Sequence, residues 1–217
     1  MISDREQTRT IRPNSEQQRS FLVSSSFETL YGGAAGGGKS WALIIAALLG
    51  ANDPRYHAVL FRRTIPQLNG ADGLIHISRD IYPWVAGASY KETDHVWTFT
   101  GGATVRFAHM ANRNDFTNYQ GHQFAFVGFD ELAQFEEMQY RYLFSRVGRT
   151  PGLRSRVCCT SNPGADWVFR RWAAWLDPKH PNPAQPGEIK WYREAEDGER
   201  DADASDPLAW SRTYIPA

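Results

Sequence analysis

Short apolar runs alternate with longer helix-like stretches along most of this chain. Nearly continuous apolar residues predict buried strands at 27–31, 57–62, 123–129 and 154–161. Between them, the spacing of apolar residues predicts helices at 41–49, 66–82, 132–147 and 167–176, of which 66–82 is interrupted by Gly70 and Gly73. A short amphipathic segment at 16–23 precedes the first strand. Buried strands that alternate with helices predict an α/β fold, with a mainly parallel central sheet flanked by helices.

Two further regions depart from this alternation. The runs 95–100 and 103–108 alternate apolar and polar residues and are joined by Gly101-Gly102, which predicts a hairpin that extends the sheet. From 177 onward the chain is rich in proline and then in charge, with short strands expected at 189–192 and 210–215. We therefore expect a flexible segment 1–15, a core 16–176 and a small lid-like extension 177–217, in which the charged run 194–206 is a solvated loop.

Composition narrows the class of protein. The chain has 217 residues, of which 41% are hydrophobic and 22% charged, so it can form a folded domain with a core and is not disordered. Its formal net charge is zero, so bulk charge does not indicate a nucleic-acid partner. Cys158 and Cys159 are adjacent in a predicted strand and point to opposite faces, which makes a bridge between them unfavourable. Without a signal-peptide pattern or a membrane-spanning apolar run, we expect a cytoplasmic protein.

The first stretch with recognisable chemistry lies between the first predicted strand and the first predicted helix. It has the form G-x-x-x-x-G-K-S and comprises Gly33, Ala34, Ala35, Gly36, Gly37, Gly38, Lys39 and Ser40. Glycines let the backbone N–H groups turn toward phosphate oxygens, Lys39 can reach the β- and γ-phosphates, and the Ser40 hydroxyl can bind Mg²⁺. Because strand, loop and helix occur in the required order, we interpret this stretch as a phosphate-binding loop rather than a flexible Gly/Ala loop.

Two acids follow the predicted strand 123–129. A carboxylate at the end of such a strand, here Asp130, is typical of the Mg²⁺ site of nucleotide hydrolases, and Glu131 is then placed to take a proton from the attacking water. Acids at this position are also common at a helix N-terminus, where they interact with the helix dipole. The phosphate-binding loop earlier in the chain favours the catalytic interpretation.

Other polar residues stand where strands end. Arg62 and Arg63 close the strand 57–62, either as ligand contacts or as a solvated strand end. Ser161 and Asn162 close the strand 154–161 and are expected to face the γ-phosphate.

Three candidates lie on predicted helices. Gln18, in the segment 16–23, either reads an adenine edge through its amide or is an ordinary helix-surface residue. Arg146 and Arg149 lie near the end of the helix 132–147. They are our first candidates for an arginine that a neighbouring subunit inserts into the site, but basic residues also favour helix C-termini for local reasons.

Taken together, these residues resemble the ATPase domain of the large terminase subunit of tailed bacteriophages, the motor that packages DNA into the procapsid. The resemblance runs from about residue 17 to the last residue. Four blocks carry it, namely 30–40 (LYGGAAGGGKS), 60–64 (LFRRT), 128–132 (GFDEL) and 160–163 (TSNP). The resemblance implies a P-loop NTPase of the additional-strand type that uses ATP and Mg²⁺. It also implies that the chain forms a homo-oligomeric ring on a portal protein, with double-stranded DNA and a small terminase subunit as further partners. The expected location is the host cytoplasm, and no membrane partner is expected.

The resemblance also implies roles for single residues. Gln18 matches the adenine-contacting glutamine, with Gln17 as the alternative register, and Ser161-Asn162 match the motif that couples hydrolysis to DNA movement. Asp130 and Glu131 match the Mg²⁺ carboxylate and the catalytic glutamate. Arg62 closes a core strand next to the site, and we therefore expect it to contact ATP within the same subunit. Some members place the inserted arginine just before a glycine upstream of the Asp-Glu pair, where this chain has Gln120-Gly121.

Two other interpretations are weighed against a DNA-packaging motor. One is another P-loop ATPase of helicase or recombinase type, for which further motifs are expected, and the other is a nucleotide-dependent switch that does not hydrolyse ATP. Glu131 argues against the switch, which needs no base beside the Mg²⁺ carboxylate. Family members usually carry a nuclease domain after the ATPase. We do not expect this chain to cut DNA, because the acids of the run 194–206 lack strands that would hold them at metal-binding distance.

Overall fold

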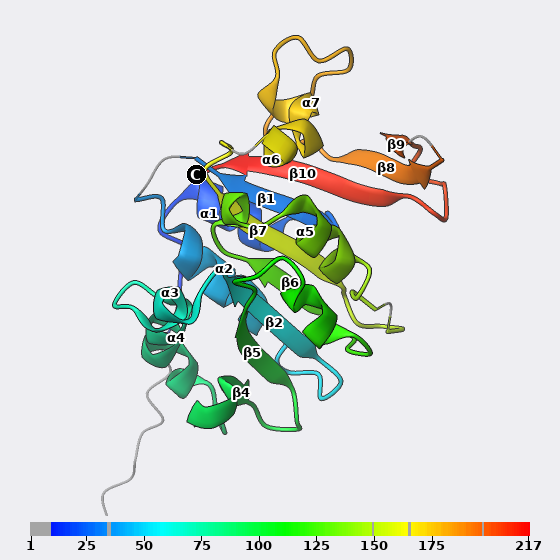
Figure 1. Ribbon diagram of the computed structural model, residues 1–217. Coiled ribbons are helices and arrows are strands. Elements are labelled where there is room, and N and C mark those ends of the chain that lie inside the picture. The colour runs from blue at the N-terminus through cyan, green and yellow to red at the C-terminus, as the bar shows by residue number, and fades with distance from the viewer. Residues whose placement is uncertain (1–9, 34–35, 149, 165, 197) are drawn as a thin grey trace, which may run out of the picture.

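The computed structural model describes residues 10–33, 36–148, 150–164, 166–196 and 198–217, and the strands in these residues form one sheet (Figure 1). The strands are β1 (Glu28–Gly32), β2 (His57–Arg62), β3 (Ser89–Lys91), β4 (Val96–Thr98), β5 (Thr104–His109), β6 (Phe126–Phe129), β7 (Arg156–Ser161), β8 (Lys190–Ala195), β9 (Gly198–Asp201) and β10 (Trp210–Pro216). Their order across the sheet is β3-β4-β5-β2-β6-β7-β1-β10-β8-β9.

The middle of the sheet is parallel and both of its flanks are antiparallel. Strands β5, β2, β6, β7, β1 and β10 are parallel neighbours, and β4 pairs antiparallel with β5 across the turn at Gly101-Gly102, which confirms the predicted hairpin. Strand β7 lies between β1, which leads into the phosphate-binding loop, and β6, which ends before Asp130. This inserted strand is the mark of an additional-strand P-loop fold, as expected.

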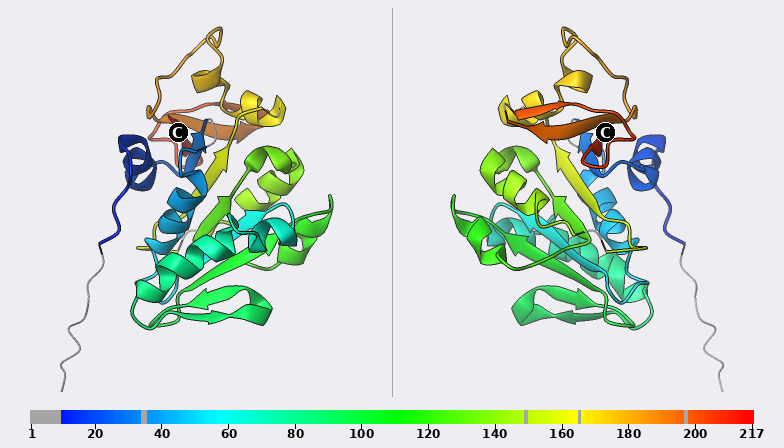
Figure 2. Two further views of the ribbon diagram at one scale, coloured as in Figure 1. Left: turned by 90° about the vertical axis from the view of Figure 1, so that its left-hand side faces the viewer. Right: turned by 90° about the vertical axis from the view of Figure 1, so that its right-hand side faces the viewer.

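Helices cover both faces of the sheet. They are α1 (Glu16–Val23), α2 (Lys39–Leu48), α3 (Ile65–Asn69), α4 (Leu74–Ile81), α5 (Glu137–Phe144), α6 (Asp166–Arg171) and α7 (Ala173–Leu176). Figure 2 shows α1 and α2 on one side of the sheet and α5 on the other. Each face buries its own apolar cluster, and the two adjacent cysteines divide between them, with Cys158 in one cluster and Cys159 in the other. Both thiols are free and buried, which confirms that the two cysteines do not bridge.

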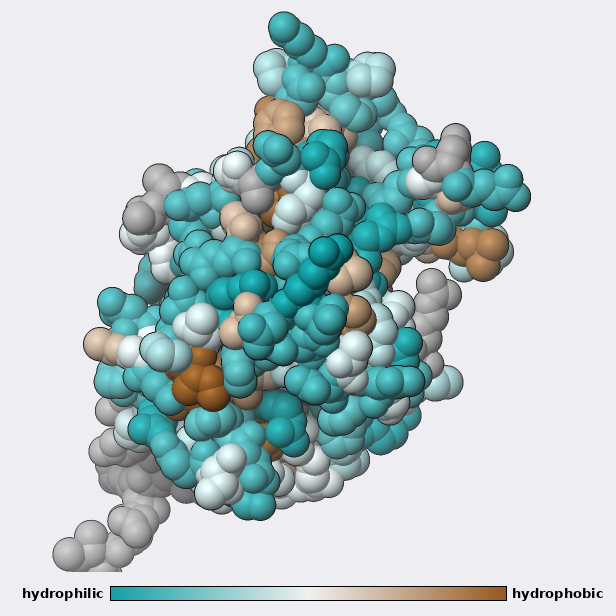
Figure 3. Space-filling view, viewed as in Figure 1, coloured by the Kyte–Doolittle hydropathy of each residue, from teal (hydrophilic) through white to brown (hydrophobic). Residues whose placement is uncertain are grey.

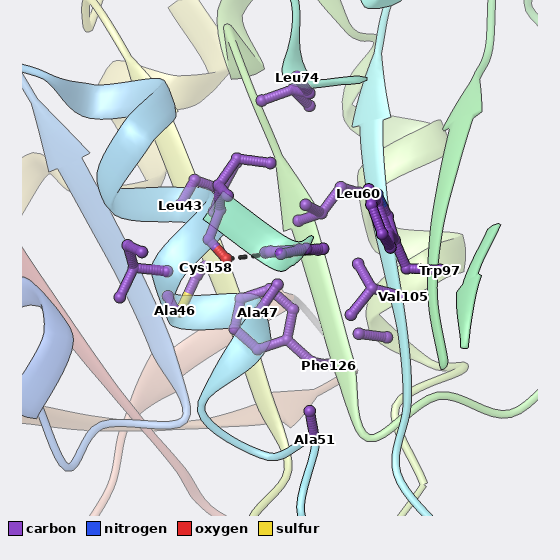
Figure 4. Close-up of a cluster of buried hydrophobic side chains, with 14 of the residues drawn as sticks. Leu43, Ala46, Ala47, Ala51, Leu60, Leu74, Trp97, Val105, Phe126 and Cys158 are labelled. Carbon is purple, nitrogen blue, oxygen red and sulfur yellow. Dashed lines mark hydrogen bonds between the residues drawn. The ribbon is translucent and has the colours of Figure 1, made fainter. Parts of the chain in front are cut away.

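Helix α2 lies unusually close to the sheet. At Gly128 in β6 a Cβ atom would stand 2.2 Å from Cδ2 of Leu60 and 3.2 Å from Cδ1 of Leu43. Leu43 belongs to α2, and Figure 4 shows it beside Leu60 and Phe126 in the core. The missing side chain at Gly128 thus lets the helix that follows the phosphate-binding loop pack directly onto the strand that precedes Asp130.

The predicted helix 132–147 is shorter than expected. A 3₁₀ turn covers Leu132–Gln134, and α5 begins only at Glu137. The break has a local cause, since Glu136 forms a capping box with Gln139 and thereby starts a new helix. The predicted helix 167–176 is likewise divided into α6 and α7, whereas the interruption of 66–82 between α3 and α4 was expected from its glycines.

The region after residue 176 differs most from the sequence-based expectation. Strand β10 lies inside the sheet between β1 and β8, so the expected lid-like extension 177–217 is continuous with the central sheet. The charged run 194–206 was expected to be a solvated loop without strands. This expectation is wrong for residues 194–195, which end β8, and for Gly198–Asp201, which forms β9. The physical reason is that Glu199 binds two arginines of the interior, Arg171 and Arg212.

These arginines belong to a buried ionic cluster at the amino end of β1. Glu28 is fully buried, and its carboxylate accepts hydrogen bonds from Nε of Arg212 at 2.7 Å and from the Tyr140 hydroxyl at 2.6 Å, as well as from Arg171. Burial by itself raises the pKa of Glu28. The charges of Arg171 and Arg212 and the hydrogen bonds from Arg171 and Tyr140 outweigh this effect and lower the pKa from 4.5 to about 2. The cluster ties α5, α6, β9 and β10 to β1.

One face of the molecule is mostly polar. The face in Figure 3 shows hydrophilic residues with separate small hydrophobic areas between them. In the part of the chain that the structure describes, no helix has the length and apolar character needed to cross a membrane.

The Glu28 cluster predicts a specific loss of stability in acid. Because the folded pKa of Glu28 lies below the unfolded value, its contribution is complete above about pH 4.5 and is lost as the pH falls toward about 2. The shift corresponds to about 3 kcal/mol of unfolding free energy. Glu28→Gln should lower the unfolding free energy at neutral pH by about 3 kcal/mol and reduce its acid dependence, as measured by denaturant titration at several pH values. The exposed Glu196→Gln should change it by less than about 0.5 kcal/mol, and an equal effect of both variants would contradict the assignment.

Candidate nucleotide site

The candidate site lies at one edge of the sheet. Parallel strands all end at the same edge, so the residues that follow β1, β2, β6 and β7 come together there. In Figure 1 this is the edge near the mark for the C-terminus, where β1 and β10 end. The sequence-based expectation that polar residues gather at these strand ends is met for the phosphate-binding loop, Arg62, Asp130 and Ser161.

The described part of the phosphate-binding loop curls around its own lysine. Nζ of Lys39 donates to the carbonyl oxygen of Gly33 at 3.0 Å, and Lys39 is only 8% exposed. Gly38 precedes α2 with φ 62°, a left-handed conformation that favours glycine, and the Tyr31 hydroxyl donates to the Gly37 carbonyl at 3.2 Å. Of the predicted loop residues, Ala34 and Ala35 lie outside the described part of the chain. The described end of the loop leads directly into the N-terminus of α2, where the helix dipole and free N–H groups favour an anion.

Helix α1 is docked on this loop through Gln18. The side chain is 2% exposed, and its Nε2 lies 3.4 Å from the carbonyl oxygens of both Gly37 and Gly38. A Cβ atom at Gly38 would stand 2.3 Å from the same nitrogen, so glycine is needed there for this contact. Gln17 is exposed, which favours Gln18 over the alternative register. The contact of Gln18 with adenine stays a prediction.

Asp130 is a fully enclosed acid of the site. Its side chain is fully buried and both of its oxygens are engaged. Oδ1 accepts a hydrogen bond from the Thr160 hydroxyl, and Oδ2 lies 2.6 Å from Nε and 2.5 Å from Nη2 of Arg62. Nη2 of Arg62 also donates to the Ser40 hydroxyl at 3.3 Å. Three strand ends and the start of α2 thus converge on one carboxylate.

Glu131 follows in a conformation that few residues adopt. Its φ of 57° and ψ of 55° lie in the left-handed region, which is costly for a residue with a side chain and is frequent at functional sites. Its N–H donates a hydrogen bond to Oγ1 of Thr160 at 3.3 Å. The same Thr160 hydroxyl donates a hydrogen bond to Asp130. Within the described residues, its carboxylate has no hydrogen-bond or ion-pair partner. Thr160 therefore orients both acids and leaves the Glu131 carboxylate open to act on another group.

The end of β7 joins the two halves of the site. The carbonyl oxygen of Ser161 accepts from the N–H of Gly33 at 3.2 Å, and its buried hydroxyl accepts from the N–H of Ala133 at 3.1 Å. Asn162 is exposed beside it. Ser161 thus contacts both the phosphate-binding loop and the turn after Glu131, whereas the coupling role of Ser161 and Asn162 stays a prediction.

The remaining predicted arginines lie away from this edge. The carbonyl oxygen of Arg146 accepts a hydrogen bond from the N–H of Phe124, which precedes β6, whereas Asp130 follows the other end of that strand. It therefore lies at the opposite edge, with its guanidinium 4.9 Å from the centre of the Tyr142 ring. Arg149 lies outside the described residues. Because Arg146 cannot reach the site of its own subunit, a catalytic role for it requires a second subunit.

Two residues that make hydrogen bonds within the site were given no individual role in the sequence-based analysis. Thr160 appears there only as part of a motif, and Tyr31 only as part of a strand. Each is a polar group inside an apolar strand, and that pattern is the one signal that points to them. Their partners lie on other strands or loops and are not evident from the sequence.

Asp130 and Ser40 are the side chains suited to hold a metal beside the phosphate-binding loop. Across the ranges that the structure describes, no group of three or more His, Cys, Asp or Glu side chains could hold a metal ion. Mg²⁺ in phosphate-transfer sites is commonly held by one or two side chains together with phosphate oxygens and water. One nitrogen of Arg62 contacts both Asp130 and Ser40, so both oxygens face the same cationic group.

Comparison with known proteins shows which family and fold this chain shares. No curated protein sequence matches the chain. Among solved structures, the large terminase of the thermophilic bacteriophage D6E matches with a TM-score of 0.62 at 16% identity, over 80% of this chain and 45% of that chain. Structures of the D6E protein in complex with ADP and with ATP-γ-S also match, with TM-scores of 0.58 and 0.57 at 17% identity, each over 79% of this chain and over 44% and 43% of those chains.

A mutant of the Thermus phage P74-26 large terminase ATPase domain matches with a TM-score of 0.58 at 15% identity, over 95% of this chain and 86% of that chain. These identities show a common fold, and this chain spans less than half of the D6E protein. The family is shown by a sequence-family model, which is described as terminase large subunit, T4likevirus-type, N-terminal. It matches residues 30–208 of this chain. The chain therefore belongs to the family of phage large terminase subunits and corresponds to their N-terminal part.

Proposed function

We propose that this chain is the ATP-hydrolysing motor part of a large terminase, in which hydrolysis drives double-stranded DNA into a viral procapsid. The observation that carries the proposal is the meeting of Asp130, Glu131 and Ser40 beside a curled phosphate-binding loop. The complexes of the similar D6E terminase with ADP and ATP-γ-S support the proposal that this chain binds a nucleotide.

The proposed chemistry uses the chain's own residues in distinct ways. Asp130 and Ser40 hold Mg²⁺, which supplies positive charge at the phosphates when bound. Lys39 and the N–H groups at the start of α2 bind the phosphate oxygens. The carboxylate of Glu131 accepts a proton from the attacking water, and Thr160 keeps that residue and Asp130 in fixed relation.

A homo-oligomeric ring is part of the proposal. Arg146 lies at the sheet edge opposite the nucleotide site, so a ring that places this edge against the next subunit's site allows it to act there. Its Nε is buried without a hydrogen-bond partner among the described residues. Double-stranded DNA, a portal protein and a small terminase subunit are the further partners that we propose on the basis of the family.

Substitution of Glu131 tests the hydrolytic step. Glu131→Gln should bind ATP nearly normally and reduce turnover by about two to four orders of magnitude, because it removes the proton acceptor. Phosphate release with and without double-stranded DNA measures this, and stimulation by DNA separates a packaging motor from a nucleotide switch. Glu137→Gln, a nearby acid on α5, should turn over at the wild-type rate, and Lys39→Ala should lose both binding and turnover. Wild-type turnover in Glu131→Gln would show that another group is the base.

Substitution of Thr160 tests the link between the two acids. Thr160→Val keeps the shape of the side chain but leaves Asp130 and the N–H of Glu131 without their shared hydroxyl. We expect the unfolding free energy to fall by about 1–3 kcal/mol and kcat to fall much more than KM rises. Denaturant unfolding and steady-state kinetics measure the two effects. Thr160→Ser retains the hydroxyl and should restore kcat, so equal kinetics for the serine and valine variants would refute this role.

Mixing experiments test the arginine that acts between subunits. Specific activity should rise with protein concentration, because an arginine inserted by a neighbour adds roughly three to five orders of magnitude in rate. Glu131→Gln protein, which retains Arg146, should restore activity to inactive Arg146→Ala protein when the two are mixed. The same mixture with an Arg146→Ala, Glu131→Gln double variant as donor is the control and should stay inactive. Activity that is independent of concentration and of Arg146 would exclude this residue.

A further inference from the structure

Arg62 occupies an unusual position for a residue expected only to contact ATP. It ends β2, and its guanidinium spans from the end of β6 to the start of α2. A single nitrogen, Nη2, lies 2.5 Å from Oδ2 of Asp130 and 3.3 Å from Oγ of Ser40. This positively charged nitrogen therefore stands between the two oxygens that the proposed function gives to Mg²⁺.

The guanidinium and a metal ion cannot share this position. Mg²⁺ requires oxygen ligands at about 2.0–2.1 Å in near-octahedral geometry, which leaves no room for a nitrogen between the same two oxygens. The two groups also carry charge of the same sign and repel each other at this distance. Occupation of Asp130 and Ser40 by a metal thus requires Arg62 to move away.

The burial of Asp130 explains why a cation is needed there at all. The carboxylate is fully buried, and a buried charge without a partner is strongly unfavourable. Thr160 satisfies one oxygen, and Arg62 supplies the positive charge at the other. If Arg62 leaves the Asp130 carboxylate, another cation must replace it. The displaced Arg62 guanidinium can then pair with the phosphates of the nucleotide.

We propose that Arg62 is the exchangeable counter-cation of the metal site, which holds Asp130 and Ser40 in position and yields them to the metal that arrives with the nucleotide. This inference rests on the proposed function, since it takes Asp130 and Ser40 as metal ligands. It assigns Arg62 a role in ordering the binding events, beyond a simple contact to ATP. Metal binding and the Arg62–Asp130 ion pair exclude each other, so each weakens the other by the same factor.

The neighbouring arginine provides a matched control. Nη1 of Arg63 donates to Oε1 of Gln139 at 2.7 Å, and Nε2 of Gln139 donates to the carbonyl oxygen of Asn112 at 2.7 Å. Arg63 is partly exposed like Arg62 but is bound to α5 and not to the metal ligands. Its substitution removes an equal charge from the same strand end without affecting Asp130.

The test measures how strongly a metal enhances nucleotide binding, which does not depend on turnover. The Kd of a fluorescent ADP analogue is determined in EDTA and in saturating Mg²⁺ for the wild-type, Arg62→Gln and Arg63→Gln proteins. In Arg62→Gln the ratio of the Kd in EDTA to the Kd in Mg²⁺ should rise about fivefold or more over wild type, because the metal no longer competes with a cation and Asp130 repels phosphates when no metal is present. In Arg63→Gln the ratio should stay within about twofold of wild type.

Each other outcome overturns the inference. If Arg62→Gln weakens binding equally with and without Mg²⁺, Arg62 is only a nucleotide contact, and if the ratio falls, Arg62 assists the metal instead of competing with it. Wild-type protein that binds no nucleotide, or binds it without metal dependence, would refute the proposed function and this inference together. Arg62→Lys keeps a cation, and it should raise the ratio by less than Arg62→Gln. If thermal unfolding shows that the glutamine variant is not folded, Arg62→Lys is tested in its place. In that case a Kd ratio that does not exceed the wild-type ratio overturns the inference.

Discussion

The buried carboxylate of Asp130 is the group on which the arrangement of the site depends. A carboxylate without water is tolerated only with hydrogen bonds and an opposite charge, and Asp130 obtains these from Thr160 on β7 and Arg62 on β2. The three residues meet because β6 stands between β2 and β7. A different strand order would separate Asp130 from Thr160 or from Arg62. The strand order of the sheet is therefore required for the hydrogen bonds and the ion pair of this site.

The close approach of α2 to the sheet brings the phosphate-binding loop to this carboxylate. Gly128 allows the helix to pack on β6, which places Ser40, at the start of α2, within reach of Arg62. On the other side of the loop, α1 is held by the buried amide of Gln18. The loop therefore lies between α2, which follows it, and α1, which precedes it in the chain. Gly128 in β6 provides the space for α2, and Gly38 in the loop provides the space for Gln18 of α1.

The two edges of the sheet use buried charge for different purposes. At the amino edge of β1, Glu28 is bound by two arginines and a tyrosine, and Glu199 completes the cluster, so every charge has a permanent partner. At the carboxyl edge, Asp130 has one arginine, and that arginine also reaches a hydroxyl. The first arrangement stabilises the packing of α5, α6, β9 and β10, whereas the second leaves a cation that another cation can replace.

The sequence by itself determined those features whose signal is local. Apolar runs predicted the bounds of β2 without error and those of most other strands to within a few residues, and the Gly101-Gly102 pair predicted the hairpin. The loop motif and the Asp-Glu pair indicated the candidate nucleotide site. The alternation of strands and helices indicated a parallel sheet, because each buried strand must return to the same edge. The break at Glu136 also has a local cause, a capping box that the sequence contains but that the helical periodicity of 132–147 hides.

Only the tertiary structure decided how distant charges pair. Glu199 lies in a run that looks like solvated surface, and it is held by arginines on α6 and β10. Thr160 and Arg62 meet Asp130 from positions 30 and 68 residues away. Hydrophobic periodicity reports which face of an element is buried, but a hydrogen bond or ion pair between separate strands depends on strand order and register, which leave no mark in the local sequence. For this reason the acids of the site were evident from the sequence, and the groups that hold them in place were not.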